Sequence, residues 1–381
     1  MADLLAIIYA QPDNFPPTIN CIQRVSSEFE NIQLVYRKHH EIQWKFQKNV
    51  ERIETPFPMP ARTQQNASFF TKLKVYFAFM KTVRKILKTG KPDVVLCFDT
   101  YSLMSLDHCK KLGVKLPKIW YHSHDVLEDG SFSKFSLSSW SKTSEKNLSD
   151  IIHLFTLPSK ERLTSYPNME KASTVVMPNY PSKKVARKNI AIDPNNVCKW
   201  IYQGAISLGH GIEEIMTFIA LSDLEQSLTL CGFCQENYKT DLIQLATKLD
   251  ILDRIQFLGE IPYAELADIT CQHHIGIAVY NKSDLMSRSV AQASNKIYEY
   301  AACGLAVLYF HSSHFEADLK EYSWTFASDL QQKSIASCVE EVNADFSDIS
   351  SEASKSFSEH LNYEVVFNKK VRQPLFQLLD K

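Results

Sequence analysis

Glycine is scarce in this sequence of 381 residues, with only 10 in all, against a usual share of about 7%. No apolar run approaches the ~20 residues that span a bilayer, so we expect no membrane-spanning helix. The 9 cysteines form no disulfide framework, and Asp3 stands where a secretory signal would be basic. These absences exclude a disulfide-stapled miniprotein and favour a cytoplasmic protein with reduced thiols.

The composition is otherwise that of a globular protein, with 45% hydrophobic and 22% charged residues. The net charge of −1 hides an uneven distribution. Residues 1–190 hold 28 Lys and Arg against 17 Asp and Glu, whereas residues 191–381 hold 14 against 26. This asymmetry indicates that one half faces an anionic partner. Nucleic acid is not expected as that partner, because no nucleic-acid-binding motif accompanies the basic half.

Short apolar runs alternate with amphipathic stretches along the chain, a pattern typical of βα units around parallel sheets. The expected strands are residues 4–10, 93–98, 118–122, 151–156, 173–177, 198–203, 227–231, 254–258, 275–279 and 305–309. The expected helices include residues 67–88, 100–112, 212–221, 236–249, 263–271 and 296–303. The pattern predicts an α/β protein with two doubly wound, Rossmann-like domains.

A segment rich in proline, asparagine and lysine begins at Pro178 and has the composition of an interdomain linker. We therefore expect an N-terminal domain over residues 1–185 and a C-terminal domain over residues 186–361. Residues 362–381 are expected to form a terminal helix that Pro374 kinks or ends.

Most glycines lie at or beside the ends of the second-half strands, where an open parallel sheet places its ligand crevice. Gly204 opens a short loop after one strand, and Gly211 begins the next helix. Close backbone approach and free N–H groups at such a helix start suit a phosphate, and His210 could supply a cation or a donor there. The alternative is a plain βα turn, because the segment is no GxGxxG fingerprint and has no Walker lysine.

A second stretch places charged residues at another helix start. Ser294 or Asn295 can cap a helix that begins at Lys296, and Glu299 stands one turn inside it. A helix start binds a diphosphate, Lys296 adds positive charge, and a carboxylate one turn away can accept both hydroxyls of a ribose. The alternative is a capped helix with an incidental glutamate.

Together these stretches resemble the C-terminal half of the GT-B glycosyltransferases, specifically the retaining family 4 type. The resemblance covers about residues 198–310, in the order and spacing of the family. It implies a GT-B fold, with two domains facing across a cleft and the terminal helix packing back on the first. It also implies transfer of a sugar from a nucleotide-sugar to a glycan or lipid-linked acceptor. UDP-sugars are the first choice of donor, and GDP-sugars are the second. No metal is expected.

The resemblance also implies which residues bind the donor. They are Gly204, His210, Gly211, Gly232, Glu260, Ile261, Pro262, Ser294, Asn295, Lys296 and Glu299. Lys296 and the two helix starts would hold the diphosphate, Glu299 would bind the ribose, and the loop at residues 260–262 would lie near the base. Residues 280–284 are expected to select hydroxyls of the sugar.

The first half matches the family more weakly, through the strand end that carries His124. In the family a histidine at this place contacts the transferred sugar, and Asp125 or Glu128 could orient it here. A structural role for the histidine is the alternative. With Lys296 and Glu299, His124 completes the catalytic set that the resemblance implies.

Two departures from the family pattern concern charge. Ala205 and His210 replace the usual cations near the diphosphate, although Lys296 or Arg288 could compensate, and Ala291 replaces the first acid of a Glu-x7-Glu pair. They motivate an alternative function, a catalytically inert GT-B paralogue that binds a sugar nucleotide or a protein partner. A GT-B epimerase is a further alternative, whereas a dehydrogenase would need a GxGxxG turn.

Residues 55–92 contain no Asp or Glu but eight Lys and Arg, interleaved with aromatic and aliphatic side chains. A basic amphipathic helix of this kind, from Phe69 to Lys88, can lie on an anionic membrane surface. The alternative is a helix packed on its own sheet with a solvated basic face. The membrane interpretation fits a lipid-linked acceptor and a peripheral location at the inner face of the cell membrane.

Overall fold

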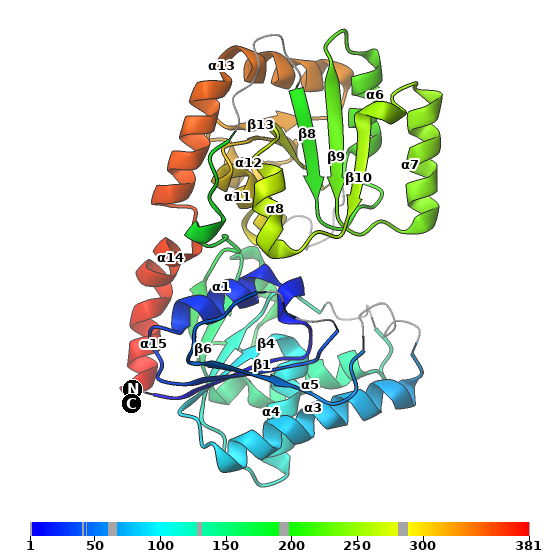
Figure 1. The fold of residues 1–381 in the computed structure, drawn as a ribbon. Helices are drawn as coiled ribbons and strands as arrows, with labels where there is room; N and C mark the ends of the chain where they lie inside the picture. Colours follow the sequence, from blue (N-terminus) through cyan, green and yellow to red (C-terminus); the bar gives the residue numbers. More distant parts are fainter. Residues whose placement is uncertain are drawn as a thin grey trace. The chain divides into compact units, whose positions relative to one another are not determined.

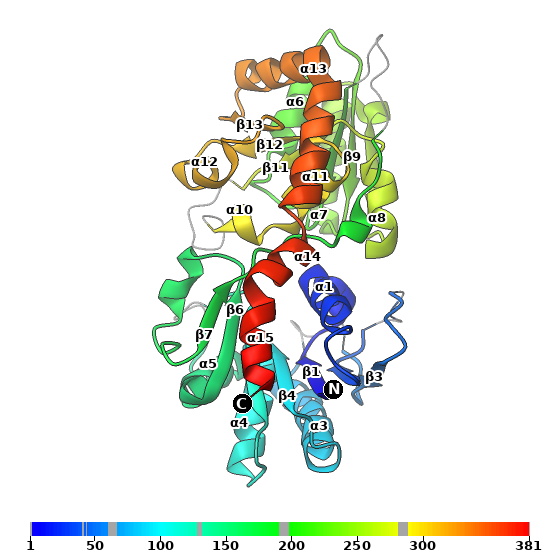
Figure 2. The same cartoon turned by 90° about the vertical axis from the view of Figure 1, so that its left-hand side faces the viewer.

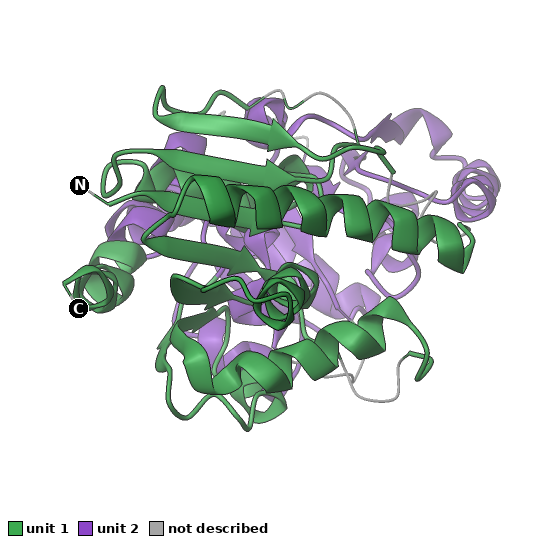
Figure 3. Cartoon of the chain, turned by 90° about the horizontal axis from the view of Figure 1, so that it is seen from below, with its two compact units in different colours: residues 1–178, 366–381 green, residues 179–365 purple. Residues whose placement is uncertain are grey.

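The computed structural model describes residues 2–39, 42, 44–59, 67–127, 132–189, 198–280 and 289–380. They form two compact units (Figure 3). Unit 1 comprises residues 1–178 and 366–381, and unit 2 comprises residues 179–365. The first boundary thus lies at the start of the proline-rich linker, ahead of the expected division after residue 185.

Unit 1 is built on a seven-stranded sheet with the order β3-β2-β1-β4-β5-β6-β7 (Figure 1). The strands are β1 (Leu4–Ile8), β2 (Ile32–Tyr36), β3 (Val50–Glu54), β4 (Val94–Phe98), β5 (Lys118–His122), β6 (Ile152–Leu157) and β7 (Ser173–Val176). All pairings are parallel. The strand order reverses between β1 and β4, and doubly wound sheets bind ligands at such a switch point.

The helices of unit 1 are α1 (Pro16–Val25), α3 (Phe69–Thr89), α4 (Asp99–Lys111), α5 (Leu137–Leu148) and α15 (Arg372–Leu379). Ser68 caps α3 by accepting a hydrogen bond from the Thr71 amide. The apolar face of α3, including Phe79 and Val83, is buried in unit 1, while its lysines lie largely on the surface. The apolar face of α3 is thus packed inside its own domain. None of the described helices is both long and apolar enough to cross a membrane.

Unit 2 is built on a six-stranded parallel sheet with the order β10-β9-β8-β11-β12-β13. Its strands are β8 (Cys198–Gln203), β9 (Gln226–Cys231), β10 (Ile255–Gly259), β11 (Ile275–Ala278), β12 (Ala306–Phe310) and β13 (Thr325–Ser328). Its helices are α6 (Ile212–Leu221), α7 (Glu236–Lys248), α8 (Tyr263–Thr270), α10 (Val290–Ala293), α11 (Asn295–Ala302), α12 (Ser313–Leu319) and α13 (Gln332–Glu359). The switch point of this sheet lies between β8 and β11.

The chain returns to unit 1 through α14 (Tyr363–Val366), a π-helical turn (Phe367–Val371) and α15. Pro374 lies in the first turn of α15, where its missing N–H is tolerated, so the irregular turn precedes the proline. α15 lies beside β6 (Figure 2), and Lys118 donates a hydrogen bond of 2.6 Å to the Leu378 carbonyl. These contacts fix the end of the chain to the sheet of unit 1.

Candidate functional site

Two strand ends of unit 2 meet through glycines at the carboxyl edge of the sheet. The Gly204 amide donates to the Cys231 carbonyl at 2.9 Å, and the Gly232 amide donates to the Gly259 carbonyl at 2.7 Å. A Cβ atom at Gly232 would lie only 1.8 Å from the Gly204 carbonyl oxygen, so no other residue fits there. Gly204, Gly232 and Gly259 thus form this edge of the sheet, called the glycine edge below, where these three residues have no side chain of their own to cover the backbone.

Two helix starts lie at the same edge of the sheet. Gly211 precedes α6 with a φ of 74°, and a Cβ there would lie 3.1 Å from the Val279 side chain. Ser294 occupies the N-cap position of α11, but its hydroxyl hydrogen-bonds the Tyr280 hydroxyl at 2.9 Å instead of capping the helix. Of the two expected capping residues, Ser294 thus takes the N-cap position, without the side-chain cap hydrogen bond, and Asn295 is the first residue of the helix. Neither start is capped by a side chain, which leaves first-turn amides and a positive dipole end for an anion.

Lys296 lies in the first turn of α11 and reaches back towards β8. Its Nζ is 4.0 Å from the centre of the Tyr202 ring and 4.9 Å from that of Tyr280. The same atom lies 3.5 Å from where a Cβ on Gly204 would stand, so the ammonium group borders the glycine edge. Burial lowers the pKa of Lys296 to about 7. The lysine can therefore change its protonation state when an anion arrives.

His210 stands just before α6 and is held by aromatic neighbours. Its ring stacks on Tyr202 with centroids 5.3 Å apart, and its Nδ1 is 2.7 Å from the Tyr202 hydroxyl. The Tyr280 ring meets the same imidazole in a T-shaped arrangement, with ring centroids 5.7 Å apart. The two tyrosines thus bring His210 and Lys296 together beside the start of α6.

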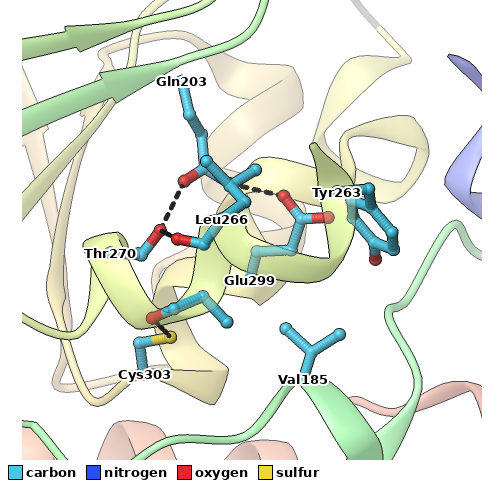
Figure 4. Close-up of a pocket in the computed structure, with 8 residues that line it drawn as sticks. Val185, Gln203, Tyr263, Leu266, Thr270, Glu299 and Cys303 are labelled. Carbon is cyan, nitrogen blue, oxygen red and sulfur yellow. Dashed lines mark hydrogen bonds between the residues drawn. The ribbon is translucent and has the colours of Figure 1, made fainter. Parts of the chain in front are cut away.

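Glu299 is buried one turn further along α11, facing the end of β8 (Figure 4). The Gln203 amide donates to Oε2 at 2.5 Å, and the Thr270 hydroxyl, 2.9 Å from the Gln203 carbonyl oxygen, fixes the orientation of that amide. Burial raises the pKa of Glu299 to about 7, against the opposing effects of Tyr263, Gln203 and Lys296. The Tyr263 side chain is a second hydrogen-bond partner of the carboxyl group. Gln203 was not among the predicted site residues.

A small cavity borders Glu299 between β8, α8 and α11 (Figure 4). Its lining is formed by Val185, Gln203, Tyr263, Leu266, Ala267, Thr270, Glu299 and Cys303. Its volume of about 10 Å³ has room for about one water molecule. A nucleoside does not fit this cavity, so the glycine edge is the better candidate for nucleotide binding.

The other expected donor-site positions have different surroundings. Glu260, Ile261 and Pro262 form the loop between β10 and α8 at the same sheet edge, directly before Tyr263. Ala291 is fully buried, and its carbonyl accepts the Tyr298 hydroxyl at 2.7 Å, so an acid at this position would be buried as well.

Several expected positions cannot be placed. Glu128, Arg288 and residues 281–284 of the expected sugar-selecting stretch lie outside the described residues. Within the described ranges, no group of three or more His, Cys, Asp and Glu side chains could hold a metal ion.

In unit 1, His124 comes shortly after β5 and is 3% exposed. Its imidazole stacks between Phe98 and Phe15, each with centroids 5.3 Å away. Asp99 accepts hydrogen bonds from the His124 amide at 2.7 Å and from Nδ1 at 2.9 Å, while the Thr18 hydroxyl lies 3.2 Å from Nε2. Both ring nitrogens are thus engaged by residues of unit 1.

Asp99, and not Asp125, is the carboxylate that orients His124. The Asp125 side chain is 63% exposed and lies 3.7 Å from Arg162. Asp99 adopts a left-handed φ of 62° at the start of α4, a strained conformation for a residue with a side chain. Burial acts to raise the pKa of Asp99, but hydrogen bonds and charge from His124 outweigh it and lower the pKa. Asp99 was not predicted, although it comes directly after β4, beside the strand that carries His124.

No family model matches the chain, and no curated protein sequence matches it either. Among solved structures, sucrose-phosphate synthase from Thermosynechococcus elongatus aligns with a TM-score of 0.73 at 12% identity, over 100% of both chains. HepE from Anabaena, in complex with UDP and glucose, aligns with a TM-score of 0.68 at 13% identity over 100% of both chains. The chain has the GT-B fold.

A further GT-B neighbour is a glycosyltransferase from Rickettsia africae, with a TM-score of 0.68 at 12% identity over 100% of this chain and 99% of the other. The expected fold of two doubly wound α/β domains is confirmed. Because the identities are this low, the likeness establishes the fold alone. What this GT-B chain binds has to be argued from its own residues.

Proposed function

We propose that this GT-B protein is a retaining glycosyltransferase that moves a sugar from a UDP-sugar to a hydroxyl of a glycan or lipid-linked acceptor. The observation that carries the proposal is the convergence of two uncapped helix starts, Lys296 and the buried Glu299 at the glycine edge of unit 2. The structural neighbour HepE, solved with UDP-glucose, supports the choice of donor.

In this proposal the amides at the starts of α6 and α11 hold the diphosphate, and Lys296 neutralises it. The departing diphosphate gains negative charge as the glycosidic bond to it breaks, so preorganised donors stabilise the transition state. An anion beside Lys296 favours its protonated form, because opposite charges raise the pKa of an amine. Glu299 accepts hydrogen bonds from the ribose hydroxyls.

Retention results if the acceptor hydroxyl attacks the sugar from the face that the diphosphate leaves. The bond from the anomeric carbon to the acceptor oxygen forms while the bond to the diphosphate oxygen breaks, and the hydroxyl proton passes to the departing diphosphate. We assign His124 to contact with the transferred sugar, as the family resemblance implies. We assign Asp99 to positioning His124, because Asp99 accepts hydrogen bonds from its Nδ1 and its amide.

The proposal is tested by incubating the protein with UDP-glucose, UDP-galactose, UDP-N-acetylglucosamine and GDP-mannose. A transferase is expected to release nucleoside diphosphate slowly from one of them by hydrolysis, and the Lys296→Ala variant should not. Binding without any release would favour the inert paralogue, which Ala205 and Ala291 motivate. Binding is measured as a rise in the melting temperature of the protein. If none of the four nucleotide-sugars raises it, the proposal is wrong.

We also propose that the protein binds an anionic membrane surface through exposed side chains at the starts of α3 and α5. Phe70 is 81% exposed, and Phe69 contacts the exposed Trp140 with ring centroids 5.8 Å apart. Exposed lysines further along α3 include Lys81 and Lys85. Aromatic rings insert at the headgroup level, and each nearby lysine contributes about 1 kcal/mol on anionic lipid.

Vesicle sedimentation tests the membrane contact. The wild-type protein should sediment with vesicles of phosphatidylglycerol and phosphatidylcholine but much less with phosphatidylcholine alone. The Phe70→Ser/Trp140→Ser variant should lose most of this binding, and neutralising Lys81, Arg84, Lys85 and Lys88 should weaken it further. Equal sedimentation of wild type and both variants would contradict the proposal.

A further inference from the structure

Arg37 is a buried cation whose charged and hydrogen-bonding neighbours among the described residues include no carboxylate. It comes directly after β2 at the carboxyl edge of the unit 1 sheet and is 3% exposed. Its Nε and Nη1 atoms have no hydrogen-bond partner among the described residues. Burying a charge that is neither paired nor hydrogen-bonded is strongly unfavourable, so such groups in folded proteins normally have an anionic partner.

The surroundings of Arg37 are aromatic. Its guanidinium carbon lies 4.5 Å from the centre of the Tyr9 ring, which in turn lies 5.5 Å from Tyr101. Burial lowers the pKa of Arg37, and the groups that raise it again are these two tyrosines, with no carboxylate among them. On the neighbouring strand, Glu54 already has two partners. It forms an ion pair with Lys38 at 3.1 Å and accepts a hydrogen bond from the Tyr36 hydroxyl.

Three more buried polar groups lie at the same edge of unit 1. The Thr55 hydroxyl and the Gln11 amide nitrogen have no hydrogen-bond partner among the described residues, and the Tyr9 hydroxyl is paired with the Arg37 side chain. Tyr9, Arg37 and Thr55 are the first residues after β1, β2 and β3, and these strands are adjacent and in register. Gln11 lies two residues after Tyr9, and its carbonyl oxygen accepts a bond of 2.9 Å from the His39 amide, which leaves its NH₂ group to donate.

These four buried groups can all donate, and the one pairing of their donors among the described residues is that between Arg37 and Tyr9. Each unsatisfied buried donor costs about 1–3 kcal/mol, and a charged one costs more. Each such group in a folded protein needs an explanation, and a bound ligand that completes the hydrogen bonds is one. The guanidinium and the amide NH₂ group can only donate, and the guanidinium is charged, so an anionic acceptor is the partner that would satisfy both.

We propose that Arg37, Tyr9, Gln11 and Thr55 form a subsite for an anionic oxygen group, a phosphate or a carboxylate, carried by the acceptor. The assignment to the acceptor rests on the proposed function. The guanidinium fork binds two oxygens of such a group side by side, and the hydroxyls and the amide reach the remaining lone pairs. The subsite borders the switch point between β1 and β4, on the opposite side from the strand that carries His124.

The first test measures how anions change the melting temperature of the protein in saturating UDP. UDP then occupies the proposed site in unit 2, so phosphate cannot bind there. The probes are inorganic phosphate, glucose 6-phosphate, glucuronate and dihexanoyl phosphatidic acid, which separate a free phosphate, a sugar acid and a lipid headgroup. At least one should raise the melting temperature of the wild type and leave that of Arg37→Met unchanged. The matched control is Arg52→Met, which removes an exposed arginine from the adjacent β3 and should keep the full shift.

The second test uses the stability of the variant. Arg37→Met replaces an unpaired buried charge with an apolar side chain of similar length, so its melting temperature without anion should equal or exceed that of the wild type. Arg37→Lys keeps the charge but loses the fork, and it should show a reduced anion shift.

Three results would overturn the subsite: no anion shifts the wild type, the shift survives in Arg37→Met, or Arg37→Met melts well below the wild type. UDP titrations of the same variants should be unchanged, because the UDP site is in unit 2. Failure of the anion experiment with intact UDP binding would therefore remove the subsite and leave the proposed function standing. Failure of UDP to bind the wild type would count against the proposed function and the assignment to the acceptor, and it would leave the anion subsite itself standing.

Discussion

The two units share one architecture and differ in the residues at the carboxyl ends of their strands. Each has a parallel sheet whose strand order reverses once, between β1 and β4 in unit 1 and between β8 and β11 in unit 2. In unit 2, glycines form these ends or come directly after them, at Gly204, Gly232 and Gly259. In unit 1, residues with polar side chains come directly after β1, β2 and β4 instead, namely Tyr9, Arg37 and Asp99.

This difference indicates two ways of recognising a ligand. An open backbone with uncapped helix starts presents N–H groups, which suits a phosphate that every nucleotide-sugar carries. Side chains such as Arg37 and His124 recognise the shape and charge of one particular molecule. Recognition of this kind suits an acceptor, because acceptors differ between enzymes. Substitutions in each unit test this division, from the largest expected effect to the smallest.

The largest effect should come from removing the cation of unit 2. Lys296→Ala should reduce turnover by about 100-fold to 1000-fold, because a donor aimed at developing negative charge is lost. Lys248→Ala, on the exposed end of α7, removes the same charge elsewhere in unit 2 and should leave turnover unchanged. Steady-state release of UDP measures both, and equal activity of the two variants would remove Lys296 from the site.

A smaller effect is expected from Glu299. Glu299→Ala should weaken UDP binding by about 1–3 kcal/mol, the range for lost hydrogen bonds to a charged group. Calorimetry with 2′-deoxy-UDP sharpens the test, because a nucleotide that lacks one ribose hydroxyl should lose less affinity on the same substitution. If both nucleotides lose the same affinity, Glu299 does not bind the ribose.

Unit 1 should respond differently from unit 2. Asp99→Asn should lower kcat by up to about 100-fold, as for a reacting group misplaced by ~1 Å, while the Kd for UDP stays unchanged. Asp125→Asn is the matched control and should have wild-type activity, because that side chain faces solvent. A change in UDP affinity for Asp99→Asn would break the division between the units.

The smallest effect concerns pH. The pKa of Lys296 is lowered to about 7, so above that pH the free protein loses the ammonium that attracts the diphosphate. The pKa of Glu299 is raised to about 7, so below that pH the carboxyl is protonated and accepts fewer hydrogen bonds. UDP affinity should therefore peak near pH 7 and fall on both sides.

The acid limb of that profile belongs to Glu299 and the alkaline limb to Lys296. Glu299→Gln should flatten the acid limb without altering the alkaline one, which a pH series of calorimetric titrations measures. A profile that is flat in the wild type would show that neither group titrates in this range.

The unit 2 site was largely predictable because glycines mark the ends of its strands in the sequence. The predicted strand at residues 198–203 and the predicted helix at residues 212–221 coincide with β8 and α6. Short-range sequence patterns were enough to predict this site, because an apolar strand, a glycine-containing turn and a helix start follow one another within a few residues. The role of Gln203 was missed because it depends on α8 and α11 packing against the end of β8.

The unit 1 site was less predictable because its residues meet only through tertiary pairing. Asp99 and His124 are brought together by the register of β4 and β5, in which Phe98 lies opposite His122. β2 and β3 were missed altogether, since β3 (VERIE) is a largely exposed edge strand with little apolar content. Arg37 was therefore not recognised as the residue after a strand.

The central claim is that the glycine edge of unit 2 binds a nucleoside diphosphate, and a crystal structure with UDP tests it most directly. The diphosphate should lie against Gly204 and the starts of α6 and α11, with Lys296 beside it and the ribose hydroxyls on Glu299. UDP bound at another place, or a well-ordered structure from a saturated soak with this edge empty, would contradict the claim.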